Sequence, residues 1–198
     1  MERPADDRGL ATLSDEELAA QAAREGSDGV AFTALMDRFR ERVWRVCWRL
    51  MGSQEDAEDA AQEVFVRLFF DRSRFAGRSR YSTWLHGVAS RTCLTLRRSR
   101  SRRRRREQAE SAAGDDAGPV QAHADPKAMP SATVDAALDA DKLLEGLDEE
   151  DRALVLMKFA ENHDYDELAE MFDASPGALR MRVSRIREKL AARAGRIF

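Results

Sequence analysis

Apolar side chains in this chain recur every three or four residues, the spacing that places them on one face of a helix. A first long helix is indicated by Phe32, Leu35, Met36, Phe39, Val43, Val46, Cys47 and Leu50. Ser53 is a suitable N-cap for a second helix, and a third is expected from about Thr83 to Leu96. No stretch of useful length alternates apolar and polar residues as a strand does. The chain is therefore predicted to be all-α.

The composition changes in the middle of the chain. Residues 107–134 are rich in Ala, Asp, Gly and Pro and hold few large apolar side chains, which is typical of a flexible linker. Helical spacing resumes beyond this segment. We therefore predict two small helical domains, at 28–106 and 135–198, joined by the linker and preceded by an N-terminal tail at 1–27.

Charge is strongly segregated, although the net charge is only -3. Residues 72–106 hold 13 arginines and no carboxylate, whereas residues 107–172 hold 18 carboxylates against four basic side chains. Residues 173–198 are basic again, with seven basic side chains against two carboxylates. Two basic regions that can meet an anion are thus separated by an acidic stretch. The opposite signs also predict that the two domains can close on each other in an inactive form.

The sequence shows no pattern of catalytic or metal-binding residues. Cys47 and Cys93 form no CxxC pair, and the three histidines do not cluster at zinc spacing. There is no nucleophile–base set, and no stretch reaches the roughly 20 apolar residues of a membrane span. We expect a cytoplasmic protein that is not an enzyme, with no cofactor, no metal, no membrane contact and no small-molecule substrate.

A helix-turn-helix pattern occupies about residues 164–193. Asp164 and Glu167 fit a capping box at the start of a short helix. Residues 173–175 form a tight break, and Ser175, followed by proline, fits the start of a second helix. That helix combines an apolar stripe with a basic outer face, the layout of a recognition helix in a major groove. The residues expected at DNA are Ser175, Gly177, Arg180, Met181, Ser184 and Arg185, with Arg182 and Arg187 on phosphates. The alternative is an ordinary surface helix with solvated arginines.

The second predicted helix begins with an unusual number of carboxylates. Glu55, Asp56, Glu58, Asp59 and Glu63 lie within nine residues. The helix dipole favours carboxylates near an N-terminus, which explains part of this pattern. A partner protein with a basic helix would explain the rest.

Three segments together resemble one family, the extracytoplasmic-function (ECF) sigma factors of the sigma-70 family. The run from Asp56 to Leu68, DAEDAAQEVFVRL, resembles the family's polymerase-binding helix. A second resemblance is to the family's segment that melts and reads the promoter −10 element. It lies in Phe75-Ala76-Gly77, Tyr81-Ser82-Thr83-Trp84-Leu85 and Val88-Ala89. Residues 164–190 resemble the helix-turn-helix that reads the −35 element. The resemblance spans roughly residues 28–98 and 135–194, and the order of the three motifs makes it specific.

The resemblance implies core RNA polymerase and promoter DNA as partners, together with the anti-sigma factor that commonly holds family members. Contacts to polymerase would come from Asp56, Glu58, Asp59, Gln62, Glu63 and Phe65. Contacts to −10 DNA would come from Phe75, Arg78, Arg80, Tyr81, Arg91, Arg97 and Arg98, with the two aromatic rings as platforms for unstacked bases. The −35 element would be read by the eight helix-turn-helix residues named above. Many members carry Asn at the position of Arg91, so the identity of the −10 bases is not transferred. Trp84 is interpreted as a core residue.

Eight of the ten residues at 97–106 are arginine. This run fits either a helix that tracks duplex phosphates, which we favour, or a basic arm. Two other classes of protein stay open. A stand-alone helix-turn-helix regulator would leave the acidic helix and the first basic region unexplained, and an RNA-binding adaptor would leave the helix-turn-helix unexplained.

Overall fold

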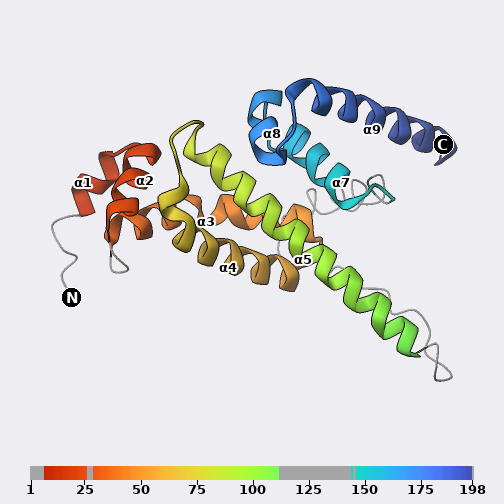
Figure 1. Ribbon diagram of the computed structural model, residues 1–198, viewed down its shortest axis with the longest axis horizontal. Helices are drawn as coiled ribbons and strands as arrows, with labels where there is room; N and C mark the ends of the chain where they lie inside the picture. The colour runs from red at the N-terminus through yellow and green to blue at the C-terminus, as the bar shows by residue number, and fades with distance from the viewer. Residues whose placement is uncertain (1–6, 26–28, 112–143, 145, 198) are drawn as a thin grey trace.

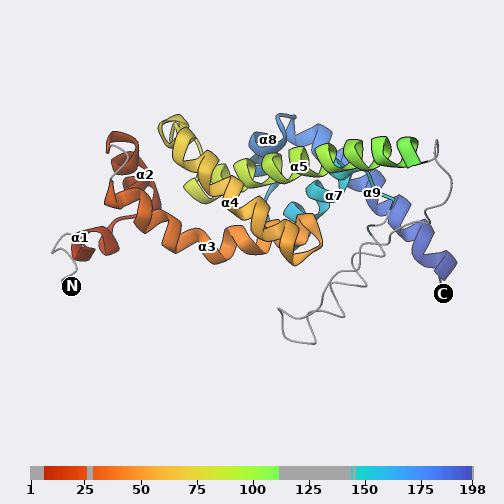
Figure 2. The same ribbon diagram turned by 90° about the horizontal axis from the view of Figure 1, so that it is seen from below.

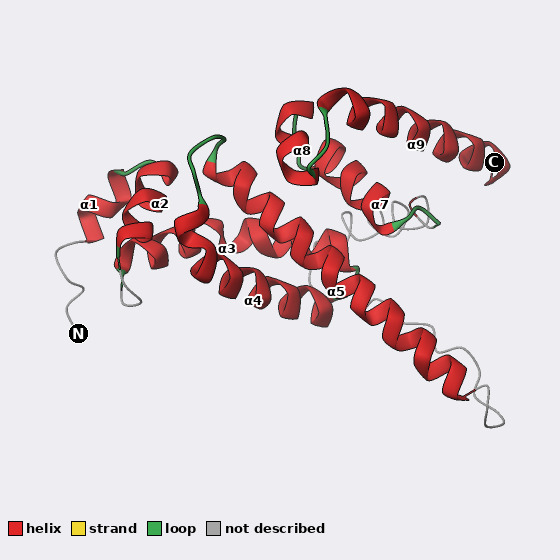
Figure 3. Ribbon diagram, in the orientation of Figure 1, coloured by secondary structure: helices red, strands yellow, loops and turns green. Residues whose placement is uncertain are grey.

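The computed structural model describes residues 7–25, 29–111, 144 and 146–197, and every regular element within these ranges is helical (Figure 3). The first group of helices is α1 (Asp7–Thr12), α2 (Asp15–Arg24), α3 (Val30–Met51), α4 (Gln54–Asp71), the short 3₁₀ helix η1 (Arg72–Arg74) and α5 (Tyr81–Ser111). The second group is α7 (Glu149–Val155), the π-helical turn η2 (Leu156–Ala160), α8 (Tyr165–Phe172) and α9 (Pro176–Ile197). The all-α prediction is confirmed.

Helices α3, α4 and α5 form the body of the first domain (Figure 1). Gly52 ends α3 in the left-handed conformation, with φ of 81°, where a side chain would be strained. Ser53 then caps α4 by accepting a 3.3 Å hydrogen bond from the Asp56 backbone N–H, as its sequence position predicts. The stripe predicted for the first long helix is the face of α3 that packs into the core. Cys47 and Cys93 are buried there as free thiols, 3.7 Å apart between sulfurs.

The segment expected to be an N-terminal tail holds two helices that belong to the first domain. Leu18, Ala19 and Ala22 of α2 are buried against α3. The helix starts with a full capping box formed by Ser14 and Glu17. The first domain therefore begins before residue 28, its predicted boundary, because apolar side chains of α2 complete the core of the bundle.

Helix α5 runs from the core of the first domain through the whole arginine run to Ser111 (Figure 1). The run is therefore helical, which the sequence left open. The linker expected at 107–134 overlaps the last residues of α5, and the rest of it lies outside the described residues.

The second domain has the predicted helix-turn-helix. Asp164 accepts hydrogen bonds from the backbone of Asp166 and Glu167, and the Glu167 carboxylate accepts one from the Asp164 backbone. Asp173 ends α8 in the left-handed conformation, with φ of 50°. Ser175 then caps α9 through a 3.2 Å bond from Ala178 N. The domain's core gathers the side chains of Leu154, Met157, Leu168, Leu179, Val183 and Ile186.

The two domains lie against each other. Helices α7 and α8 pack on one side of α5, whereas α9 lies on the side of α8 that faces away from it (Figures 1 and 2). The contact therefore leaves the outer face of α9 uncovered and covers part of α5.

Candidate nucleic-acid interface

The outer face of α9 is exposed as predicted. Leu179, Val183 and Ile186 are buried against the rest of the domain, which fixes the opposite face toward solvent. The predicted residues that stay exposed are Ser175, Gly177, Arg180, Met181, Ser184, Arg185 and Arg187. Met181 is 58% exposed, unusually high for a large apolar side chain. A basic helix face with an exposed apolar residue at its centre suits both base edges and thymine methyl groups.

Arg182 is oriented differently from these residues. Its guanidinium pairs with the carboxylates of Asp148, Glu150 and Asp151, which open helix α7. Burial lowers the pKa of Arg182, but the hydrogen bonds and charges of these three carboxylates outweigh burial, so that the pKa is raised overall. The expectation that Arg182 lies on a DNA phosphate is therefore not supported by this structure, because its donors are already used to hold α9 on α7.

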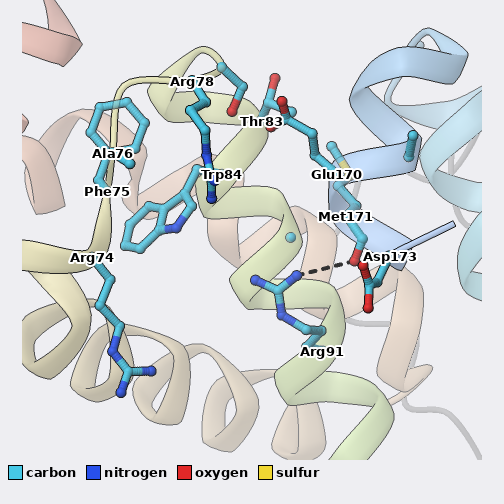
Figure 4. A pocket seen from close by; sticks show the side chains of 13 residues that line it. Arg74, Phe75, Ala76, Arg78, Thr83, Trp84, Arg91, Glu170, Met171 and Asp173 are labelled. Atoms are coloured by element: carbon cyan, nitrogen blue, oxygen red, sulfur yellow. Dashed lines mark hydrogen bonds between the residues drawn. The ribbon is translucent and has the colours of Figure 1, made fainter. Parts of the chain in front are cut away.

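The loop that precedes α5 and the start of that helix line a cavity of about 480 Å³ (Figure 4). The rings of Phe75 and Trp84 and the side chains of Arg78 and Arg91 lie on its first-domain wall. Glu170, Met171 and Asp173 of the second domain form the other wall. Aromatic rings beside guanidinium groups are the combination that single-stranded bases require.

Tyr81 does not take part in this cavity. Its ring is 3% exposed and packs between Phe39, Phe75 and Trp84, with centroids 5.3–5.6 Å apart. Burial raises the pKa of its hydroxyl. Tyr81 therefore belongs to the core in this structure, whereas Trp84, which the sequence places in the core, lines the cavity together with Phe75.

Glu16 is a positioning residue that the sequence did not reveal. Its carboxylate accepts a 3.0 Å hydrogen bond from the Tyr81 backbone N–H and so caps the first turn of α5. This contact spans 65 residues of sequence, so local patterns carried no signal of it. It ties helix α2 to the start of α5.

Three of the arginines predicted at −10 DNA are bound to the second domain. Arg91 donates a 3.1 Å bond to the Met171 carbonyl oxygen (Figure 4). Arg97 pairs with Glu149, and Arg98 with Glu150. Two other predicted residues, Arg78 and Arg80, are exposed. The residues predicted to contact −10 DNA thus lie on one helix and the loop before it, and the second domain covers some of them.

Helix α4 presents a mixed acidic and apolar face. Glu58, Asp59 and Gln62 are exposed, as a polymerase contact would require. Val66 and Phe70 continue the same face, 50% and 73% exposed. The remaining predicted residues, Asp56, Glu63 and Phe65, are partly buried. Val66 and Phe70 are absent from the set predicted from sequence, although their positions four and eight residues after Gln62 could have revealed them.

The arginine run approaches this acidic face. Arg100 pairs with Asp56 and lies 3.6 Å from a carboxylate oxygen of Asp59. Beyond it, residues 101–109 are exposed. Arg103 makes an i, i+4 pair with Glu107 at 2.8 Å. The helix therefore projects a row of cations from the bundle.

Within the described residues, none of the helices combines the length and apolarity needed to cross a bilayer. The same residues bring together no group of three or more His, Cys, Asp or Glu side chains that could hold a metal ion.

The fold and surfaces define a class of protein: a DNA-binding factor with a helix-turn-helix domain, a long basic helix and a separate helix with an exposed acidic and apolar face. The sigma-70 region 2 family matches residues 35–103, and the sigma-70 region 4 family matches residues 137–190. The chain belongs to the sigma-70 family and is an RNA polymerase sigma factor.

Relatives of known name agree with this assignment. The chain is 28% identical over 168 residues to the ECF RNA polymerase sigma factor SigW of Bacillus subtilis, covering 82% of this chain and 88% of SigW. It is 31% identical over 159 residues to the ECF sigma factor SigE of Mycolicibacterium smegmatis, covering 79% of this chain and 58% of SigE.

Solved structures share the fold. CnrH, in complex with the cytosolic domain of CnrY, matches with a TM-score of 0.63 and 21% identity, over 91% of this chain and 97% of CnrH. The sigma factor RpoE, in complex with the anti-sigma factor NepR from Bartonella quintana, matches with a TM-score of 0.57 and 19% identity, over 80% of this chain and 93% of RpoE.

Proposed function

We propose that this sigma factor binds core RNA polymerase through the exposed face of α4 and directs it to promoters with two elements. Helix α9 reads the −35 element in the major groove. The loop at 75–80 and the start of α5 hold the non-template strand of the −10 element. The chain is not itself a catalyst in this scheme, and it acts in the cytoplasm, where the promoter DNA is.

One observation carries the proposal. The exposed stripe of α4, with carboxylates at Glu58 and Asp59 and apolar side chains at Val66 and Phe70, lies on the same domain as the basic α5. A surface for a basic, partly apolar protein groove and a surface for DNA are thus fixed relative to each other. A stand-alone regulator needs only the second.

The residues divide by surface. On α4 the contacts come from Glu58, Asp59, Gln62, Val66 and Phe70. At −10, stacking comes from Phe75 and Trp84, with Arg78, Arg80, Arg91, Arg97 and Arg98 as cations. At −35, Arg180, Met181, Ser184 and Arg185 read base edges, with Ser175, Gly177 and Arg187 at the backbone. An anti-sigma factor is a further expected partner, since RpoE was solved bound to NepR.

In vitro transcription tests the proposal. Core polymerase alone and core polymerase with this protein are compared on a pool of promoter fragments from a bacterial genome. Initiation at a discrete set of sites, only with the protein present, is the expected result. Tight, specific binding to duplex DNA without polymerase, and no effect on initiation, would instead identify a stand-alone regulator.

A further inference from the structure

Another cavity, of about 450 Å³, lies where α5 passes the turn that joins α3 to α4. Figure 1 shows α5 continuing well beyond this turn. The volume lies within the range of small-ligand sites, about 300–1,000 Å³. Ser53 of the turn and Glu149 of α7 lie on two sides of the cavity, and four arginines of α5 line a third. These arginines are Arg97, Arg100, Arg104 and Arg105.

The four arginines share one face of α5. With 3.6 residues per turn, positions 97, 100, 104 and 105 fall within an arc of about 140° around the helix axis. Arg102, Arg103 and Arg106 fall on the opposite side, and none of these three lines the cavity. The end of α5 therefore has two basic faces, an inner one that lines the cavity and an outer one that faces solvent.

Carboxylates neutralise only part of the inner face. Arg97 pairs with Glu149 and Arg100 pairs with Asp56, so each of these two arginines already has an anion beside it. Within the part of the chain that the structure describes, the other two arginines of the inner face make no ion pair. Four guanidinium groups against two carboxylates leave the lining with an excess of positive charge. Like charges gathered in this way repel one another unless an anion lies nearby.

The donors around the cavity suit phosphate oxygens. A guanidinium group can donate two parallel hydrogen bonds to one phosphate group. Ser101 and Gln108 add neutral donors to the same lining. Ser53 is the N-cap of α4, and the start of a helix carries partial positive charge. Two uncompensated cations and this number of donors match an anion with several charged oxygens better than a single carboxylate.

We propose that this cavity binds a free oligophosphate, either inorganic or the di- or triphosphate group of a nucleotide, between Arg104, Arg105 and the start of α4. A nucleic-acid backbone offers the same phosphate chemistry. A compact oligophosphate fits the recess better, because it concentrates its charge beside the two uncompensated arginines. A continuous backbone would instead have to pass the carboxylates of Asp56 and Glu149. Binding of the oligophosphate requires neither promoter DNA nor polymerase.

Calorimetric titration of the full chain with inorganic triphosphate, at about 0.15 M salt to screen diffuse attraction, tests the site. The wild-type protein should bind one triphosphate per chain. Arg104→Gln with Arg105→Gln should weaken binding roughly tenfold or more, because charge-assisted hydrogen bonds are lost. Arg102→Gln with Arg106→Gln is the matched control, since it removes the same charge from the outer face, and it should change the affinity by about twofold at most. All four substituted arginines are exposed, so neither variant disturbs the core.

A second pair of variants should strengthen binding or leave it unchanged. Glu149→Gln removes a negative charge from the lining and frees Arg97, so inorganic triphosphate should bind several-fold more tightly. Glu150→Gln is the control. Glu150 pairs with Arg98 and Arg182, so its substitution also removes ion pairs of α7, but it does not line the cavity. The affinity of Glu150→Gln for triphosphate should equal that of the wild-type protein.

Three results would overturn the proposal. Absence of triphosphate binding to the wild-type protein is the first. The second is an equal loss of affinity in the two double arginine variants, or equal affinities of Glu149→Gln and Glu150→Gln, either of which would mean diffuse attraction and no defined site. The third is a loss of affinity for labelled duplex DNA in Arg104→Gln with Arg105→Gln while triphosphate binding stays unchanged, which would assign the inner face to a nucleic-acid backbone.

Discussion

His86 Nδ1 and His163 Nε2 lie 2.6 Å apart across the contact between α5 and the second domain. A neutral pair can share one proton, with one ring donating and the other accepting. The second nitrogen of His86, Nε2, is buried and has no hydrogen-bond partner among the described residues. Protonating His86 would therefore bury a cation whose Nε2–H has no hydrogen-bond partner among the described residues.

The docked form should consequently open as pH falls. Burial, then the neighbouring His163 and the arginines Arg42 and Arg45 of α3, lower the pKa of His86 to about 3, while Glu167 acts in the opposite direction. In the open form the pKa would return toward 6.5. The contribution of neutral His86 to docking is thus complete above about pH 6.5 and declines progressively below it, by up to roughly 1.4 kcal/mol per pH unit.

Scattering between about pH 7.5 and about pH 5.5 checks this prediction, because the docking equilibrium should weaken by about a factor of ten over that range. His86→Phe serves as the control, since it removes the titrating ring and should flatten the pH dependence. An equally steep pH response in His86→Phe would assign the effect to other groups.

Substitutions of two arginines that lie close in sequence on α9 should affect different properties: stability in one case and promoter binding in the other. Arg182→Ala removes a guanidinium that pairs with three carboxylates of α7, at a site about one-third exposed. We expect a decrease of about 1–2 kcal/mol in the free energy of unfolding of the second domain, reduced from the value for buried pairs by solvent screening. Arg185→Ala should leave that free energy unchanged and cost about 1–3 kcal/mol in binding of holoenzyme to a matched promoter.

Denaturant unfolding and promoter titration separate these two effects. A uniform decrease in affinity across all sequences in Arg185→Ala would place that residue on the DNA backbone rather than on a base. A stability of Arg182→Ala equal to that of the wild-type protein would show that its three ion pairs contribute nothing, and would return Arg182 to the set of DNA-binding residues.

Substitutions on the exposed face of α4 should weaken polymerase binding, whereas substitutions on its buried face should lower stability. Phe70→Ala removes a ring that is 73% exposed, so the fold should be unaffected while binding to core polymerase weakens. Leu68→Ala, two residues away and fully buried, should instead cost about 2–5 kcal/mol of stability. Asp59→Lys should weaken polymerase binding as well, because it reverses an exposed charge on the same face.

Pull-down of core polymerase and thermal unfolding measure the two quantities for each variant. If Phe70→Ala and Asp59→Lys retain full binding, the docking face lies elsewhere on the domain.

The parts of this fold that sequence predicts well are those fixed by neighbours in the chain. Some features satisfy backbone groups within a few residues: the Ser53 cap, the Asp164–Glu167 capping box and the left-handed break at Asp173. Such features can be predicted from the local sequence pattern. The same holds for the apolar stripe of α9, which determines its outward face.

What sequence could not predict depends on partners far along the chain. Tyr81 is buried because Phe39, 42 residues earlier, packs on its ring. Arg182 is withdrawn from the DNA face because carboxylates 31 to 34 residues away lie beside it. The sequence predicts a tail where the N-terminal helices lie, because the apolar stripe around Leu18 is short and acidic residues surround it. In each case the local pattern fits two environments, and a tertiary contact decides between them.

The arginine run at the end of α5 should act on the affinity for DNA and not on the choice of sequence. Residues 101–109 are exposed and helical, so their cations lie along a projecting rod. A row of like charges repels itself unless an anion lies nearby. The run continues from the part of α5 assigned to −10 DNA, so adjacent duplex phosphates are the natural partner. Arg100, by contrast, is already paired with Asp56, and it is left unchanged in the test.

Replacing Arg102 to Arg106 with Gln should therefore weaken promoter binding by the holoenzyme and flatten its salt dependence by about 0.9 in slope for each phosphate that is no longer neutralised. Preference between matched and mismatched promoters should stay the same, because phosphate contacts position the protein without reading bases. Glutamine keeps the helix propensity close to that of arginine, so circular dichroism should show unchanged helix content. Promoter affinity measured across a salt series decides the matter: an unchanged slope would mean that this end of α5 never reaches DNA.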